Sequence, residues 1–198
     1  MLARFLAIAL AGLFIAPAAV AQPSPAASPL VARAIAYLER LDAVKGTFEQ
    51  TDPRGGVSSG ALWLARPGRA RFQYDPPSDI VITCDGRTVT VSNPRLNTLQ
   101  RAPQSATPLA VLLSDHIRLD RGVRVVRVDQ TPGGFSITAR DARGLAQGDL
   151  TLYFGDGPIR LAGWVIRDGA GRVTRVSLGP LTPAPALPPG FFSLARAG

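Results

Sequence analysis

From residue 44 to residue 178, apolar and polar residues alternate with a period close to two, in short runs separated by turn residues. Alternation of this kind is typical of β-strands with one buried and one solvated face. Asp85-Gly86 is a strong signal for a two-residue hairpin turn. The pattern therefore predicts a mostly β (α+β) fold with an antiparallel body. The expected strands, about eleven in number, cover residues 44–51, 57–66, 69–74, 79–84, 87–92, 96–101, 123–129, 134–139, 149–154, 159–167 and 172–178.

Two segments have helical periodicity instead. Ser28 can cap a helix, Pro29 suits its first turn, and apolar residues then recur at helical spacings up to about Asp42. Thr107-Pro108 begins a short apolar segment, ending at Leu113, which predicts a second helix that interrupts the sheet. A long antiparallel sheet twists until it curls or closes. Periodicity alone leaves open whether large side chains fill its concave side or a cavity remains there.

The first 21 residues combine one cation, an apolar run and the small-residue triplet Ala19-Val20-Ala21, which is the order of a cleavable secretory signal. An uncleaved membrane anchor is the alternative, but Pro17 interrupts a run shorter than the roughly 20 apolar residues that a span needs. Gln22 stands where lipid-tethered exported proteins have Cys. We therefore expect a soluble protein of the periplasm, divided into a signal (1–21), a flexible lead-in (22–28) and a single domain (29–198).

Removal of the signal would leave 21 basic residues against 14 acidic ones, and 20 of those 21 are arginines. The arginines are scattered singly through the expected strands, without the Lys/Arg blocks that follow a phosphate backbone. A solvated basic surface explains them better than a nucleic-acid site, so no nucleic-acid partner is expected.

Residues suited to catalysis are scarce. The single histidine, His116, follows Ser114 and Asp115, but residues adjacent in the chain cannot form a catalytic relay with one another. The single cysteine, Cys84, ends an apolar strand and is expected to be a small buried residue, since no neighbour would lower the pKa of its thiol. We expect no enzyme activity, no metal site and no cofactor.

Three motifs carry a resemblance to a known family. The stretch from Gly60 to Tyr74, followed by Pro76-Pro77, is similar to the Gly-x-Leu, Arg-Pro, aromatic and Pro pattern of the periplasmic outer-membrane lipoprotein carrier family, LolA. The strand at 44–50 and the turn at 84–88 resemble further family motifs. The chain departs from the family at Thr90 and Ser92, where an aromatic pair is frequent, at Ala70, where an aromatic is usual, and at Phe72, where Trp is usual.

The resemblance implies an unclosed antiparallel β-barrel with a helical lid over an apolar cavity that takes acyl chains. It also implies that Arg66 bonds to the lid and holds the unloaded form closed, for which a guanidinium with five fixed donors is well suited. The residues expected to line the lipid cavity are Phe48, Leu62, Leu64, Phe72, Tyr74, Leu109, Leu112 and Leu113.

By the same resemblance, the protein is expected to be a monomeric carrier of lipoprotein cargo. An inner-membrane lipoprotein-releasing ABC transporter would load it, and an outer-membrane lipoprotein receptor would unload it. A lipid-sensing or regulatory binding module on the same fold is the alternative. An esterase or lipase is disfavoured because the chain lacks a nucleophile motif.

Overall fold

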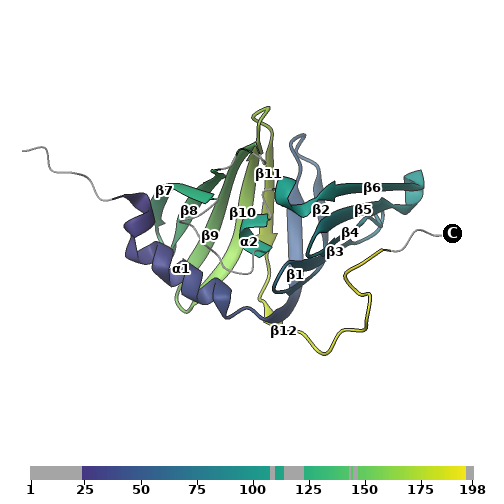
Figure 1. Ribbon diagram of the computed structural model, residues 1–198, viewed down its shortest axis with the longest axis horizontal. Coiled ribbons are helices and arrows are strands. Elements are labelled where there is room, and N and C mark those ends of the chain that lie inside the picture. Colours follow the sequence, from purple (N-terminus) through teal and green to yellow (C-terminus); the bar gives the residue numbers. More distant parts are fainter. Residues whose placement is uncertain (1–23, 108–109, 114–122, 143, 145–146, 195–198) are drawn as a thin grey trace, which may run out of the picture.

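A curved antiparallel sheet forms the body of the protein in a computed structural model, which describes residues 24–107, 110–113, 123–142, 144 and 147–194 (Figure 1). The sheet has 12 strands, and its path runs β6-β5-β4-β3-β2-β1-β11-β10-β9-β8-β7, with β12 paired to β1. The strands are β1 (Ala43–Thr51), β2 (Val57–Ala65), β3 (Arg69–Tyr74), β4 (Val81–Asp85), β5 (Thr88–Asn93), β6 (Thr98–Pro103), β7 (Val123–Thr131), β8 (Gly134–Asp141), β9 (Gly148–Asp156), β10 (Ile159–Asp168), β11 (Val173–Leu178) and β12 (Thr182–Pro183).

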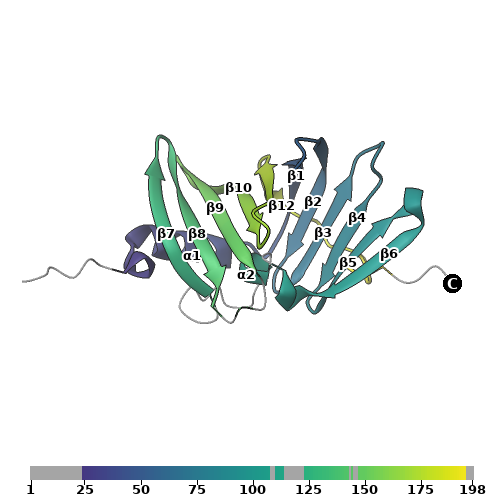
Figure 2. The ribbon, with the colours of Figure 1, turned by 90° about the horizontal axis from the view of Figure 1, so that it is seen from above.

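Two consecutive meanders, β1–β6 and β7–β11, are joined side by side through the β1–β11 pair. The free edges of the sheet are β6 and β7, which do not pair with each other, so the sheet curls without closing (Figure 2). The mostly β antiparallel body predicted from the alternation is therefore confirmed, and so is the unclosed form that the family resemblance implied.

Two strands begin two residues later than expected, for a local backbone reason. Asp79 has a left-handed φ of 52°, so β4 begins only at Val81. Pro94–Leu96 forms a 3₁₀ helix that ends on Asn97 with a φ of 48°, so β6 begins at Thr98. The two-residue strand β12 was not predicted, because a strand so short and containing Pro183 has no periodicity to detect.

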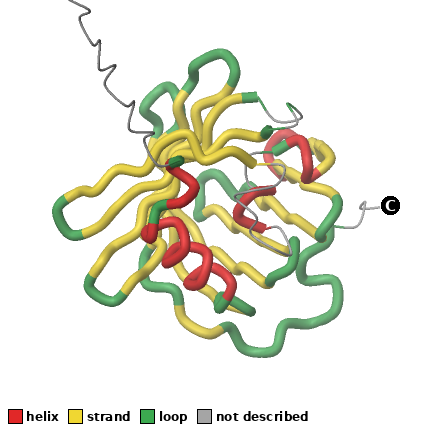
Figure 3. Tube along the Cα trace, turned by 60° about the vertical axis from the view of Figure 1, so that its left-hand side comes forward, coloured by secondary structure: helices red, strands yellow, loops and turns green. Residues whose placement is uncertain are grey.

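The long helix α1 (Pro29–Glu39) begins as expected, with Pro29 in its first turn and the Ser28 hydroxyl accepting a hydrogen bond from the Leu30 amide at 3.3 Å. It ends before Asp42. Val31, Ala34 and Leu38 are buried, and α1 crosses in front of the strands it covers (Figure 3). The second helix, α2 (Ala110–Leu113), is a single turn; residues 108 and 109 lie outside the described part of the chain.

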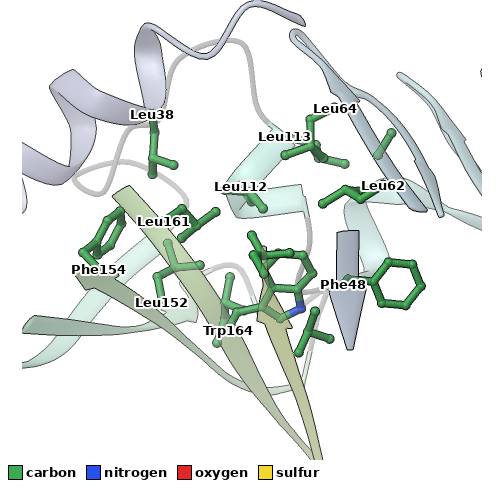
Figure 4. Packing of buried hydrophobic residues seen from close by; sticks show 14 of the residues in the cluster. Leu38, Phe48, Leu62, Leu64, Leu112, Leu113, Leu152, Phe154, Leu161 and Trp164 are labelled. Carbon is green, nitrogen blue, oxygen red and sulfur yellow. The ribbon is translucent and has the colours of Figure 1, made fainter. Parts of the chain in front are cut away.

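The core lies on the concave side of the sheet, where side chains from both meanders meet those of the helices (Figure 4). Trp164 is 2% exposed and lies at its centre. The ring of Phe72 packs edge-on against Trp164 with the centroids 6.1 Å apart, and Phe48 packs in the same way against Phe72 at 5.5 Å. Among the described residues, large side chains fill much of the concave side.

The C-terminal arm, residues 180–194, crosses the outer face of the first meander. Arg71 Nη1 donates to the Phe191 carbonyl at 3.0 Å, and the Arg71 guanidinium lies over the Phe191 ring. Trp63, on the outer side of β2, packs edge-on against the same ring at 5.2 Å. The arm thus covers outward-facing residues of β2 and β3.

None of the helices that the structure describes is long and apolar enough to span a bilayer.

Candidate functional site

Arg66 lies directly after β2 and binds the end of α1. Its Nη1 atom donates to the carbonyl oxygen of Leu38 at 2.5 Å, and its main-chain amide donates to the carbonyl of Asp42 at 2.8 Å. The last carbonyls of a helix have no partner within the helix, and the C-terminus carries partial negative charge. A half-buried guanidinium at this position satisfies a helical carbonyl and complements the charge.

The same turn also binds the second helix, which the sequence motifs did not indicate. The Gly68 amide donates to the carbonyl of Leu113, the last residue of α2, at 2.7 Å. Gly68 has a φ of +74°, and a Cβ atom there would lie 2.7 Å from the Cα of Gly86. Only glycine fits this position without displacing the β4–β5 turn. The turn 66–68 therefore holds α1 through Arg66 and α2 through Gly68, and we call it the helix-anchoring turn.

The cavity residues expected from the sequence are brought together wherever the structure describes them. Seven of the eight are buried and belong to one apolar cluster, which draws on β1, β2, β3 and α2. Leu112 and Leu113 reach from α2 toward the concave face that carries Leu62 and Leu64 (Figure 4). Leu109 lies outside the described residues. The seven are Phe48, Leu62, Leu64, Phe72, Tyr74, Leu112 and Leu113.

One polar group borders this apolar cluster. The Tyr74 hydroxyl donates to Gln50 Oε1 at 2.9 Å. Burial raises the pKa of Tyr74 to about 12, although the hydrogen bond with Gln50 opposes the rise. The phenol therefore stays neutral at physiological pH, and the described part of the first meander presents a neutral surface to the interior.

The second meander contributes apolar residues that sequence reasoning missed. Trp164 pairs with Leu152 across β9 and β10, and Leu161 pairs with Phe154 one step along the same strands. All four are at most 3% exposed. The alternation in 149–154 and 159–167 already placed these residues on one face of their strands, and it could have identified them.

The departures from the family pattern fall on different faces of the sheet. Ala70 is fully buried on the concave side, opposite Leu64 and Cys84. Thr90 lies opposite Thr83 and Arg101, in the outward-facing row that includes Arg71. Phe72 is also buried in the concave cluster, so the departures at Ala70 and Phe72 change the volume available inside the sheet.

The residues considered for catalysis show no catalytic arrangement where they are described. Burial raises the pKa of the Cys84 thiol to about 12, and the Asp85 carboxylate adds to the rise, so the thiol is protonated and unreactive. Ser114, Asp115 and His116 lie outside the described residues. In the part of the chain that the structure describes, no three His, Cys, Asp or Glu side chains are placed to hold a metal ion.

Solved structures with a similar fold are known. A protein of Desulfovibrio piger from the DUF1329 family is 10% identical, with a TM-score of 0.51 over 82% of this chain and 94% of its own. An uncharacterised conserved protein of Thermus thermophilus is 13% identical, with a TM-score of 0.50 over 84% of this chain and 96% of its own. At such identities the likeness concerns the fold alone.

Sequence comparison is more specific. An outer-membrane lipoprotein carrier protein of Chromobacterium violaceum is 25% identical over 178 residues, which cover 87% of this chain and 86% of the relative. A protein of the same description from Pseudomonas syringae is 29% identical over 139 residues, covering 66% and 60%. The model of the family described as outer membrane lipoprotein carrier protein LolA matches residues 39–195. The chain therefore belongs to the LolA family of outer membrane lipoprotein carrier proteins.

Proposed function

We propose that the protein is a periplasmic carrier that binds the acyl chains of lipoproteins released from the inner membrane and delivers them to an outer-membrane receptor. The observation that supports this most directly is the helix-anchoring turn, which holds both helices over a predominantly apolar concave face. Arg66 and Gly68, only two positions apart, donate hydrogen bonds to the main-chain carbonyls of Leu38 and Leu113. A small movement at this turn would release both helices together.

The apolar face supplies enough free energy to hold lipid in water. Burying an acyl chain gains about 0.8 kcal/mol per methylene, so one chain of roughly 16 carbons has a gross drive on the order of 10 kcal/mol. A carrier must give up its cargo again, and binding at that full strength would prevent release. Part of the gain must therefore be offset.

The closed arrangement supplies such an offset. Loading displaces Leu112 and Leu113 from the apolar cluster and breaks the bonds of Arg66 and Gly68 to the helices. Those contacts form again when the cargo leaves. The described arrangement then corresponds to the unloaded state, and cargo binding shifts the population toward an open one. In this scheme Arg66 lowers the affinity for cargo and favours its release.

Binding rather than catalysis is the function we infer, with an inner-membrane lipoprotein-releasing ABC transporter as donor and an outer-membrane receptor as acceptor. The signal pattern of residues 1–21 supports export. A carrier that meets its donor and acceptor in turn needs only one copy of the apolar face, so we propose a monomer.

The decisive experiment has two readouts. The protein is purified from the periplasm, and its contents are identified by mass spectrometry; acylated polypeptides are expected. It is then mixed with spheroplasts and with outer membranes, and movement of a labelled lipoprotein between them is followed. Transfer that needs the protein supports the carrier. Bound lipid without any transfer would instead indicate the lipid-sensing module, and absence of both would refute binding at this face.

A further inference from the structure

The outer face of the second meander carries a row of arginines. The strand register places Arg124 of β7 opposite Arg140 of β8, Arg140 opposite Asp149 of β9, and Asp149 opposite Arg167 of β10. These residues alternate along their strands with buried ones such as Val125 and Leu150, so they face outward. Four neighbouring strands thus present three guanidinium groups and one carboxylate side by side.

A second row lies beside the first. Arg127 of β7 is opposite Thr138, whose row continues through Thr151 and Val165 to Arg175 of β11. Arg124, Arg127, Arg140, Arg167 and Arg175 are all exposed, and we call these five residues the arginine patch. Among the residues that the structure describes, Asp129 and Asp149 are the acidic ones that face outward between them. Five positive charges against two negative ones leave a net charge of +3.

The acidic residues within the patch are already engaged. Asp149 accepts two hydrogen bonds from Arg140, at 2.7 and 3.0 Å. Asp129 forms an ion pair with Arg127, with 2.8 Å between Oδ2 of Asp129 and Nε of Arg127. In the described part of the chain, Arg124, Arg167 and Arg175 have no ion pair. Arg167 and Arg175 are on adjacent strands, about 4.8 Å apart, so their separation is comparable to the Debye length of about 8 Å at physiological salt. Arg124 lies three strands from Arg167 and extends the positive surface to the β7 edge.

The first meander lacks a comparable free surface. Its outward-facing Arg71 binds the Phe191 carbonyl, Arg101 binds the carbonyl of Leu194, and Arg69 lies over the Phe192 ring. The C-terminal arm therefore covers the basic side chains of β3 and β6, whereas those of the arginine patch face solvent. The other exposed arginines of the first meander, such as Arg54 and Arg87, lie singly in turns and form no comparable row.

We propose that the arginine patch is a docking surface for anionic phospholipid membranes. Guanidinium groups bind phosphate oxygens in a bidentate manner, and several of them on one gently curved face can contact several headgroups at once. Tyr153 is exposed on β9, in the row next to Arg127, and an amphipathic ring of this kind suits the headgroup region. The concave apolar face points away from this surface and stays free.

Vesicle binding tests the proposal. The purified protein, with its N-terminus defined by mass spectrometry, is floated with phosphatidylcholine vesicles that contain or lack phosphatidylglycerol. The patch variant is Arg124→Gln, Arg167→Gln and Arg175→Gln. A matched control changes three exposed arginines of the first meander, Arg54→Gln, Arg87→Gln and Arg95→Gln, and alters the net charge equally. Circular dichroism checks that both variants are folded.

The wild type is expected to bind only the anionic vesicles, and less at high salt. Each basic residue at an anionic membrane strengthens binding about fivefold, so the patch variant should bind more than tenfold more weakly, and the control within about threefold of the wild type. Equal losses in both variants, no loss in the patch variant, or binding to duplex DNA but not to vesicles would overturn the proposal. None of these outcomes bears on acyl binding by the concave face.

Discussion

Arg66 Nη1 and the carbonyl oxygen of Leu38 form a hydrogen bond between the end of β2 and the end of α1, across 28 positions of the sequence. The bond couples the helix to the turn that also binds α2. It is charge-assisted and half-buried, and bonds of this type contribute roughly 1.5–3 kcal/mol when they are well formed.

Replacing Arg66 by Leu should loosen α1 without unfolding the sheet. Hydrogen exchange of the amides in Pro29–Glu39 should become faster, and transfer of a bound lipoprotein to an acceptor membrane should become slower, because the closed state no longer competes with cargo. Arg87→Leu, at an exposed position on the β4–β5 turn, is the control. Unchanged exchange together with normal transfer would exclude the role assigned to Arg66.

Gly68→Ala should destabilise the protein by about 2–4 kcal/mol, because a strained left-handed backbone and a Cβ clash combine. The clash is with the Cα of Gly86 at 2.7 Å. Gly171→Ala is a close control, since Gly171 has a similar φ of +78° but no atom within 4 Å of the added Cβ. Urea unfolding of the two variants measures the difference. Equal destabilisation would mean that close approach to Gly86 is unimportant.

Trp164 should report directly on cargo, because it lies in the centre of the concave face. In a Trp63→Phe variant it is the only tryptophan, and acyl chains with bromine near their ends should quench its fluorescence by contact. In the converse variant, Trp164→Phe, the remaining Trp63 packs against Phe191 on the outer side and should be quenched far less. Stronger quenching of Trp63 would place the lipid outside the sheet.

Stability should fall at alkaline pH. Burial raises the pKa of Cys84 from 9.0 to about 12 and that of Tyr74 from 10.0 to about 12. The unfolded chain therefore releases protons that the folded protein keeps, beginning near pH 9. Its free energy of unfolding should decrease from there toward pH 12, by at most ~1.4 kcal/mol per pH unit for each group.

Urea titrations at stepped pH test this directly. Cys84→Ala and Tyr74→Phe should each make the alkaline decline less steep, although both variants lose some stability at neutral pH. If the free energy of unfolding of both variants declines as steeply with pH as that of the wild type, other groups cause the decline.

The period-two alternation was enough to predict the antiparallel sheet, and Ser28-Pro29 was enough to predict the start of α1, because both signals are local. The position of Gly68 against Gly86 and Leu113 could not be predicted, since it depends on how three turns meet in space. For the same reason, the sequence did not reveal that Thr83 and Thr90 are buried although they face outward.

The sequence predicted the part of the candidate site that lies on the first meander and α2, but not the part that lies on β9 and β10 of the second meander. Phe72 and Leu62 were found because they adjoin the Arg66-Pro67 motif. Trp164 and Leu152 have no motif near them; alternation places them on the inner face of their strands, but their contact with the first meander, such as that of Trp164 with Phe72, depends on the tertiary fold. The pairing of β1 with β11 closes a long loop in the sequence, and no local pattern encodes that pairing.

The absence of pairing between β6 and β7 has a consequence for the amount of cargo that the proposed carrier could accept. In a closed barrel, strand number and stagger fix the diameter, and widening it would break a ladder of main-chain bonds. Here the two free edges can move apart while every strand pair stays intact, so the interior volume can adjust to the cargo. One protein could then accept substrates with different numbers of acyl chains at similar elastic cost.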